Sequence, residues 1–212
     1  MGTSATVCIP WRPQPSRIAA YERVREFWSH HGFPVIEGDS GHTTFNVADS
    51  RNEAVSRAPS EHVIVADADC IPHIENVWRA LETTHDAIIY PYTEFRHIPA
   101  ETVTALDLML IEPDRVYRNS VGGVFVTHTE HYWALGGQDE LFDQGWGYED
   151  NAFAIVAETL SRVERIPGVL LSFNHAVDNG RDLKTNPHFA RGQLYSHLRG
   201  KPDLMRELVR RA

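Results

Sequence analysis

Two kinds of hydrophobic pattern alternate over the first third of the chain. The short apolar runs ATVCIP, FPVIE and EHVIVA are typical of buried strands. Between them apolar residues recur at helical spacing over about 17–31 and 49–58, with Ser16 and Asp49 or Ser50 as candidate N-caps. This strand–helix order predicts a parallel sheet with right-handed crossovers. We therefore expect ligands at the carboxyl edge of the sheet, just beyond the strands.

The pattern is less regular in the remainder of the chain. DAIIYP and GGVFVT predict strands, and VERIPGVLLSF predicts a hairpin or two short strands. We expect further helices over about 74–83, 101–111, 129–135, 150–162 and from about 187 onward. The predicted fold class is α/β, a mainly parallel sheet flanked by helices, in a single domain over 1–212.

The composition is that of an ordinary globular protein, with 42% hydrophobic and 23% charged residues. No apolar run approaches the roughly 18 residues that a membrane span needs, and the first residues do not have the pattern of a signal peptide. We therefore expect a cytoplasmic protein without a membrane span, in which Cys8 and Cys70 are buried free thiols.

The charge distribution bears on possible partners. The net charge of −9 argues weakly against a nucleic-acid partner. Residues 181–212 nevertheless hold eight Lys or Arg and only three Asp or Glu. Such a segment is usually a solvated helical face, and it would also suit an anionic acceptor.

Two carboxylates follow the third predicted strand directly, in Asp67-Ala68-Asp69. Side chains two residues apart at a strand end can face one cation, and their oxygens suit Mg²⁺ or Mn²⁺. The alternative is a plain turn, in which Asp is common. The position at the carboxyl edge of a parallel sheet favours a metal site.

A second group of functional residue types lies in GWGYED, residues 145–150. Its glycines allow close backbone approach, and Trp146 offers a flat face on which a sugar can stack. Glu149 and Asp150 stand at a predicted helix start, where a carboxylate can accept a proton from an attacking hydroxyl. The alternative is a glycine-rich loop with acidic helix caps. His175 is a possible metal ligand, although any one of 12 histidines is more often structural.

These segments resemble a known family. VIVADADCIP resembles the D-x-D strand of GT-A glycosyltransferases. GGVFVT followed by LGGQDELFDQGWGYEDNAFA is similar to a segment shared by the galactosyltransferase and polypeptide N-acetylgalactosaminyltransferase groups. FNVADSRNEAVSRA is similar to the F-N-x-A-x-x-R-N-x-G helix of the wider family, with Ala54 where Gly is usual. The resemblance covers about residues 7–175 and implies a GT-A fold.

The resemblance implies a metal-dependent glycosyltransferase that uses Mn²⁺ or Mg²⁺ and a nucleotide-sugar, most often a UDP-sugar. Asp69 and His175 would ligate the metal, and Asp67 would touch the ribose or a metal-bound water. Glu149 and Asp150 would face the sugar and the acceptor hydroxyl. If the reaction inverts the anomeric centre, Asp150 is the first choice of base and Glu149 the second; if it retains, the two carboxylates would position donor and acceptor.

Other positions would form the donor pocket. By the same resemblance, the residues next to the nucleotide or diphosphate would be Pro10, Arg12, Asp39 and Arg51, and those shaping the sugar pocket would be Trp146, Gly122 and Gly123. Residues of about 1–100 would then bind the nucleotide, and those of about 101–212 the acceptor. The alternative for Arg51 is a surface pair with Asp49 or Glu53.

Two other functions remain open from the sequence. A nucleotidyltransferase can use paired carboxylates on a parallel sheet, but it normally carries a glycine-rich basic phosphate loop, and IPWRPQP has no glycine. A catalytically silent sugar-binding protein would be expected to lack part of the metal triad. The acceptor is left open among a glycan, a protein, a small molecule and modified nucleic acid.

Overall fold

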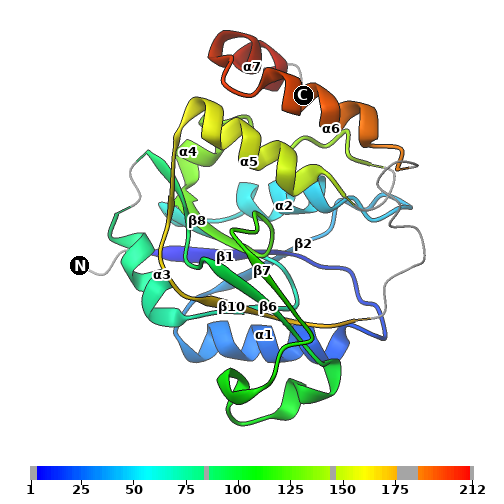
Figure 1. The fold of residues 1–212 in the computed structure, drawn as a ribbon, viewed down its shortest axis with the longest axis vertical. Coiled ribbons are helices and arrows are strands. Elements are labelled where there is room, and N and C mark those ends of the chain that lie inside the picture. Colours follow the sequence, from blue (N-terminus) through cyan, green and yellow to red (C-terminus); the bar gives the residue numbers. More distant parts are fainter. Residues whose placement is uncertain (1–3, 84–85, 144–146, 176–185, 211–212) are drawn as a thin grey trace.

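The computed structural model describes residues 4–83, 86–143, 147–175 and 186–210 (Figure 1). Two sheets form its centre. The larger sheet contains, in spatial order, β2 (Val35–Gly38), β1 (Ala5–Pro10), β3 (His62–Ala66), β8 (Val124–His128), β5 (Ala87–Tyr90) and β9 (Arg162–Arg165). The smaller sheet contains β4 (Cys70–Pro72), β10 (Val169–Phe173), β6 (Glu94–Ile98) and β7 (Arg115–Arg118).

The first three strands form the predicted parallel unit. β1 pairs in parallel with β2 and β3, so the ends of all three lie at one edge. The connections are α1 (Ile18–His30) and α2 (Val47–Ser56). The predicted caps are wrong. Arg17 stands at the N-cap of α1 and makes no side-chain cap, whereas Asn46 caps α2 through the amide of Asp49.

One strand runs against the others in the larger sheet. β8 lies between β3 and β5 and is antiparallel to both, while β9 is parallel to β5. The chain enters β8 through Gly122 and Gly123, close to the end of β3. The predicted α/β class with a mainly parallel sheet is therefore confirmed.

The smaller sheet was largely missed by the sequence pattern. β4, β6 and β7 follow no clear alternation, and β7 is exposed along its whole length. VERIPGVLLSF does form two strands, but β9 and β10 belong to different sheets and are not a hairpin. The smaller sheet carries β4 and β10 side by side, so it joins the D-x-D segment to the segment that ends at His175.

The helix predicted over about 101–111 is wrong. Two short 3-10 helices, η1 (Ala100–Thr104) and η2 (Leu108–Leu110), stand there instead. Within 101–110 only Leu108 is buried, so this stretch has no continuous apolar face to bury. The β-branched Thr102 and Val103 also lower its helix propensity.

The other predicted helices are confirmed with adjusted ends. They are α3 (Ile74–Leu81), α4 (Thr129–Ala134), α5 (Glu149–Leu160), α6 (Phe189–Leu198) and α7 (Pro202–Val209). Figure 1 shows α6 and α7 stacked on α5, which these helices contact. Cys8 and Cys70 are buried free thiols, as predicted. In the described ranges no helix is both long enough and apolar enough to cross a membrane.

Candidate active site

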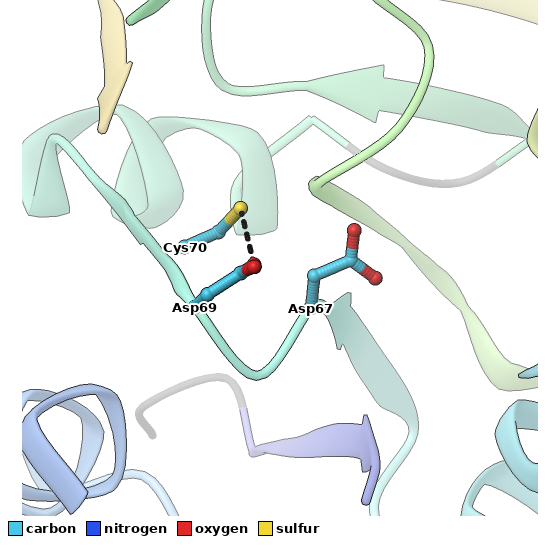
Figure 2. Close-up of side chains that lie close together, drawn as sticks. All are labelled: Asp67, Asp69 and Cys70. Atoms are coloured by element: carbon cyan, nitrogen blue, oxygen red, sulfur yellow. Dashed lines mark hydrogen bonds between the residues drawn. The ribbon is translucent and has the colours of Figure 1, made fainter. Parts of the chain in front are cut away.

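The D-x-D segment forms the turn between β3 and β4. The amide of Asp67 donates to the carbonyl of Gly123 at 2.7 Å, and the amide of Phe173 donates to the carbonyl of Asp69 at 3.0 Å. Figure 2 shows Asp67 on one arm of this turn and Asp69 and Cys70 on the other. The turn is thus held by both sheets at once, which fixes where the two carboxylates lie.

Asp69 faces one imidazole and one guanidinium group. His175, two residues after β10, places Nε2 3.2 Å from Asp69 Oδ2, and Arg17 Nη2 lies 3.4 Å from the same oxygen. Burial alone would raise the pKa of Asp69, but the His175 hydrogen bond and the Arg17 charge outweigh it and lower that pKa. Asp69 is therefore held ionised, as a metal ligand must be.

Arg51 joins the D-x-D turn to the start of α5. Its side chain is only 3% exposed, and its Nη2 lies 2.5 Å from Asp67 Oδ1 while its Nη1 lies 2.7 Å from Asp150 Oδ1. Nη1 also donates to Gln138 Oε1 at 2.9 Å. The alternative of a surface pair with Asp49 or Glu53 is therefore wrong.

The next residue, Asn52, fixes the same helix to the loop before α5. Its Oδ1 accepts from the Tyr132 hydroxyl at 2.6 Å and from the Gln138 amide at 2.9 Å. Its Nδ2 donates to the carbonyl of Gln138 and to the carboxylate of Glu140. The two residues therefore differ in their contacts: Arg51 binds the carboxylates of Asp67 and Asp150, and Asn52 binds the backbone of Gln138 together with the side chains of Tyr132 and Glu140.

Glu149 and Asp150 begin α5 in different surroundings. Tyr148 precedes them in the left-handed region with φ 75°, and the Gly147 amide donates to Glu149 Oε2 at 2.9 Å. Glu149 is 5% exposed, whereas the Asp150 side chain is 28% exposed. Burial first, and then the charge of Asp150, raise the pKa of Glu149 to about 7.

The Gly122–Gly123 turn borders both Asp150 and Asp67. A Cβ on Gly122 would lie 2.8 Å from Asp150 Oδ2, and Gly123 has φ +99° and accepts the Asp67 amide. The backbone that leads into this turn is fixed by Tyr92, whose hydroxyl donates to the carbonyls of Ser120 and Gly122. Arg165 also donates to Ser120, at 2.9 Å.

The predicted nucleotide contacts of the first two strands lie at the same edge. Pro10 ends β1 opposite Gly38 of β2. Arg12 forms a two-pronged pair with Asp39, with Nε–Oδ2 at 2.8 Å and Nη2–Oδ1 at 2.5 Å. Both side chains are partly exposed. Trp146, predicted to shape the sugar pocket, lies outside the described residues.

The acidic group is short of positive charge. Asp67, Asp69, Glu149 and Asp150, if all ionised, face the two guanidinium groups of Arg17 and Arg51, which leaves a formal charge of −2. Burial, followed by the charges of Asp150 and Asp69, raises the pKa of Asp67 to about 6 even though Arg51 opposes this.

This donor set fits a divalent cation. Oxygen atoms of Asp67 and Asp69 lie within 4.8 Å of each other and of the Cys70 sulfur, and His175 approaches Asp69 from the segment just after β10. A cation here would supply the positive charge that the group lacks.

Several residues of this group carried no signal in the sequence. Arg17, Tyr92, Gln138 and Arg165 reach it from elements that are distant along the chain. Only the fold brings them to the site, so no spacing rule could have found them.

Comparison with known proteins gives two kinds of match. Residues 106–177, about a third of the chain, match the family described as N-terminal domain of galactosyltransferase. No curated protein sequence matches. This segment includes GGVFVT and LGGQDELFDQGWGYEDNAFA, the parts of the chain that suggested the galactosyltransferase resemblance, and also His175.

Several solved structures share the fold. TarS of S. aureus, in complex with UDP-GlcNAc, matches with a TM-score of 0.58 and 12% identity, over 92% of this chain and 66% of its own. GalNAc-T7, with UDP, GalNAc and Mn²⁺, matches with a TM-score of 0.57 and 11% identity, over 90% and 47%. The catalytic domain of Drosophila β1,4-galactosyltransferase 7, with xylobiose, matches with a TM-score of 0.49 and 19% identity, over 77% and 64%.

The family match over 106–177 and the folds of TarS and GalNAc-T7 confirm the predicted resemblance. The fold is that of GT-A glycosyltransferases, and it carries a galactosyltransferase-type segment over 106–177. The chain spans no more than about two thirds of the length of these three structures.

Proposed function

We propose that the protein is a metal-dependent glycosyltransferase that moves a sugar from a UDP-sugar to a hydroxyl group of an acceptor. The observation that carries this proposal is the joining of Asp67 and Asp150 through one buried arginine, Arg51, at the carboxyl edge of a GT-A sheet. A carboxylate suited to metal binding and a carboxylate suited to proton transfer are thereby held at a fixed separation.

The metal centre is assigned to Asp67, Asp69 and His175. A divalent cation there would neutralise charge on the departing nucleoside diphosphate. The charge deficit of the acidic group and the ionised state of Asp69 support this assignment. The Mn²⁺ and UDP in the GalNAc-T7 structure and the UDP-GlcNAc in that of TarS support the choice of ion and donor.

The acceptor side is assigned to Asp150. Its carboxylate is 28% exposed and lies against the Gly122 turn, so a hydroxyl group can reach it from solvent. Glu149 is buried and accepts from the Gly147 amide, which suits it to hold the backbone that leads into α5. If the reaction inverts the anomeric carbon, Asp150 takes the proton of the attacking hydroxyl. If it retains, Asp150 orients that hydroxyl.

The donor nucleotide is assigned to the ends of β1 and β2, at Pro10, Arg12 and Asp39. The bidentate Arg12–Asp39 pair is partly exposed and follows the ends of the paired strands β1 and β2. Arg51 acts on the donor through Asp67, because both of its Nη atoms are already bound to carboxylates.

Removing the Arg51 side chain tests this indirect role. Arg51→Ala removes the buried guanidinium through which Arg51 positions Asp67 on the donor side, so we expect the donor Michaelis constant to rise far more than that of the acceptor. Steady-state kinetics with each substrate varied in turn would measure this. An unchanged donor constant would contradict the role given to Arg51.

A screen of donors tests the function itself. The protein is incubated with a panel of nucleotide-sugars and Mn²⁺, and nucleotide release and products are followed by mass spectrometry. We expect slow metal-dependent hydrolysis of one donor, and faster release when a suitable acceptor is present. Pyrophosphate release from a nucleoside triphosphate and a sugar phosphate would favour a nucleotidyltransferase. Donor binding without turnover would favour a silent sugar-binding protein.

A further inference from the structure

The D-x-D turn leads directly into a cysteine whose thiol lies among the predicted metal ligands. The sulfur of Cys70 and one carboxylate oxygen each of Asp67 and Asp69 lie within 4.8 Å of one another. The thiol donates to Asp69 Oδ1 at 3.4 Å, as Figure 2 shows, and Cys70 is fully buried. The other oxygen of Asp69 faces His175.

The sheet places the sulfur there. Cys70 is the first residue of β4 and pairs with Ser172 of β10, and β10 leads on to His175. The thiol and the imidazole are thus carried by two adjacent strands. A Cβ on Gly123 would lie 3.5 Å from the sulfur, so the glycine turn also borders it.

A sulfur donor changes which ions such a centre prefers. Carboxylates alone suit Mg²⁺ and Mn²⁺, whereas thiolate and imidazole ligands favour Zn²⁺ and Co²⁺. Because the three atoms are at most 4.8 Å apart, some point lies within about 2.8 Å of all of them. Small side-chain rotations would bring this to the metal–ligand distances of about 2.0–2.3 Å that Zn²⁺ adopts.

We propose that Cys70 is a direct metal ligand beside Asp67, Asp69 and His175, so that the four side chains form a mixed carboxylate–imidazole–thiolate centre that prefers Zn²⁺ or Co²⁺ to Mg²⁺. The thiol proton passes to solvent when the sulfur–metal bond forms. This inference rests on the proposed function only in placing the ion at the D-x-D turn.

Cobalt titration of the full chain tests the proposal. Co²⁺ added to the wild-type protein gives a thiolate-to-cobalt charge-transfer absorption that saturates at one equivalent. Cys70→Ser abolishes this absorption. It also weakens Co²⁺ binding by at least roughly 10- to 100-fold, which is the cost of losing an outer-shell partner of a metal. The affinity for Mg²⁺ changes by less than a few-fold. The matched control is Cys8→Ser, because Cys8 is also buried but lies inside β1; it keeps the absorption.

Two results would overturn the proposal: Co²⁺ binding by the wild-type protein without charge-transfer absorption, or the same absorption in folded Cys70→Ser. The first needs no variant, so a folding defect in Cys70→Ser does not affect it. Metal-dependent nucleotide release without the absorption would refute the thiol ligand alone. The absorption without nucleotide release would refute the proposed function and leave the thiol ligand standing.

Discussion

Asp150 is the carboxylate at the start of α5 that a substrate can reach, and it shares Arg51 with Asp67. Asp150→Asn keeps an oxygen for Arg51 but removes the proton acceptor. A positioned base contributes about 10²- to 10⁴-fold, so we expect turnover to fall by that order while donor binding is nearly unchanged. Steady-state kinetics and calorimetric binding of UDP-sugar measure the two effects. Turnover within a few-fold of wild type would assign Asp150 to capping the helix.

Glu149 makes the stability of the fold depend on pH. Its pKa in the folded chain is raised from an ordinary 4.5 to about 7. Between these values the folded state binds more protons than the unfolded state, so the free energy of unfolding falls as pH rises through this range. Glu149→Gln carries no charge at any pH and can still accept from the Gly147 amide, so we expect it to lose less stability from pH 5 to pH 8.

The size of this difference is on the order of 1–3 kcal/mol, since one pKa unit corresponds to about 1.4 kcal/mol. Urea unfolding of both proteins at the two pH values measures it. The matched control is Glu26→Gln, because Glu26 is exposed on α1 and its side chain is paired only at the surface. Equal pH dependence in wild type and Glu149→Gln would show that Glu149 is ionised across this range.

At the scale of elements, the segment just after β5 fixes the Gly122–Gly123 turn through Tyr92. The Tyr92 hydroxyl binds the carbonyls of Ser120 and Gly122, whereas the hydroxyl of buried Tyr90 has no hydrogen-bond partner among the described residues. Tyr92→Phe should therefore cost about 1 kcal/mol of stability. We also expect it to lower turnover by roughly 10-fold, which is about 1.4 kcal/mol of transition-state stabilisation.

Tyr90→Phe is the matched control for this effect. It removes a hydroxyl from an equally buried ring two residues away, and we expect stability and turnover to stay near those of wild type. Thermal unfolding and steady-state kinetics compare the two variants. Equal turnover in both would show that the Gly122–Gly123 turn does not depend on the Tyr92 hydroxyl.

The elements that the sequence predicted well are those with a strong periodic pattern. β1 and β3 are fully buried apolar runs, and α4 is followed by two glycines with positive φ. The helix predicted over 101–111 was wrong because Leu106, Met109 and Leu110 are exposed and leave no continuous apolar face, and β4, β6 and β7 were missed because they follow no clear alternation. The reversed direction of β8 follows from tertiary pairing and leaves no local trace.

At the scale of the whole molecule, the sequence predicts which residues form the candidate site, but it does not predict which of them contact one another. The paired carboxylates of Asp67 and Asp69 and the acidic start of α5 could be read from short motifs. That Arg51 joins Asp67 to Asp150 could not, because the three residues lie on different elements. The roles of Trp146 and of the nucleotide contacts at Pro10, Arg12 and Asp39 stay predictions.

Sugar transfer by the proposed mechanism depends on a cation held at the D-x-D turn. Asp69→Asn keeps the size of the side chain and removes its charge, whereas Asp203→Asn does the same at an acid 97% exposed on α7 and serves as the matched control. His175→Ala should act like Asp69→Asn but more weakly, because both carboxylates remain.

Nucleotide release from the preferred donor, measured with Mn²⁺ and then with excess chelator, tests this claim most directly. We expect wild type and Asp203→Asn to release nucleotide with Mn²⁺ and to stop when the ion is removed. We expect Asp69→Asn to release nucleotide at least about 10²-fold more slowly. Loss of an outer-shell partner costs about 10- to 100-fold in activity, and a direct ligand such as Asp69 matters more. Full release by wild type in chelator, or by folded Asp69→Asn in Mn²⁺, would contradict a metal-dependent transferase centred on Asp69.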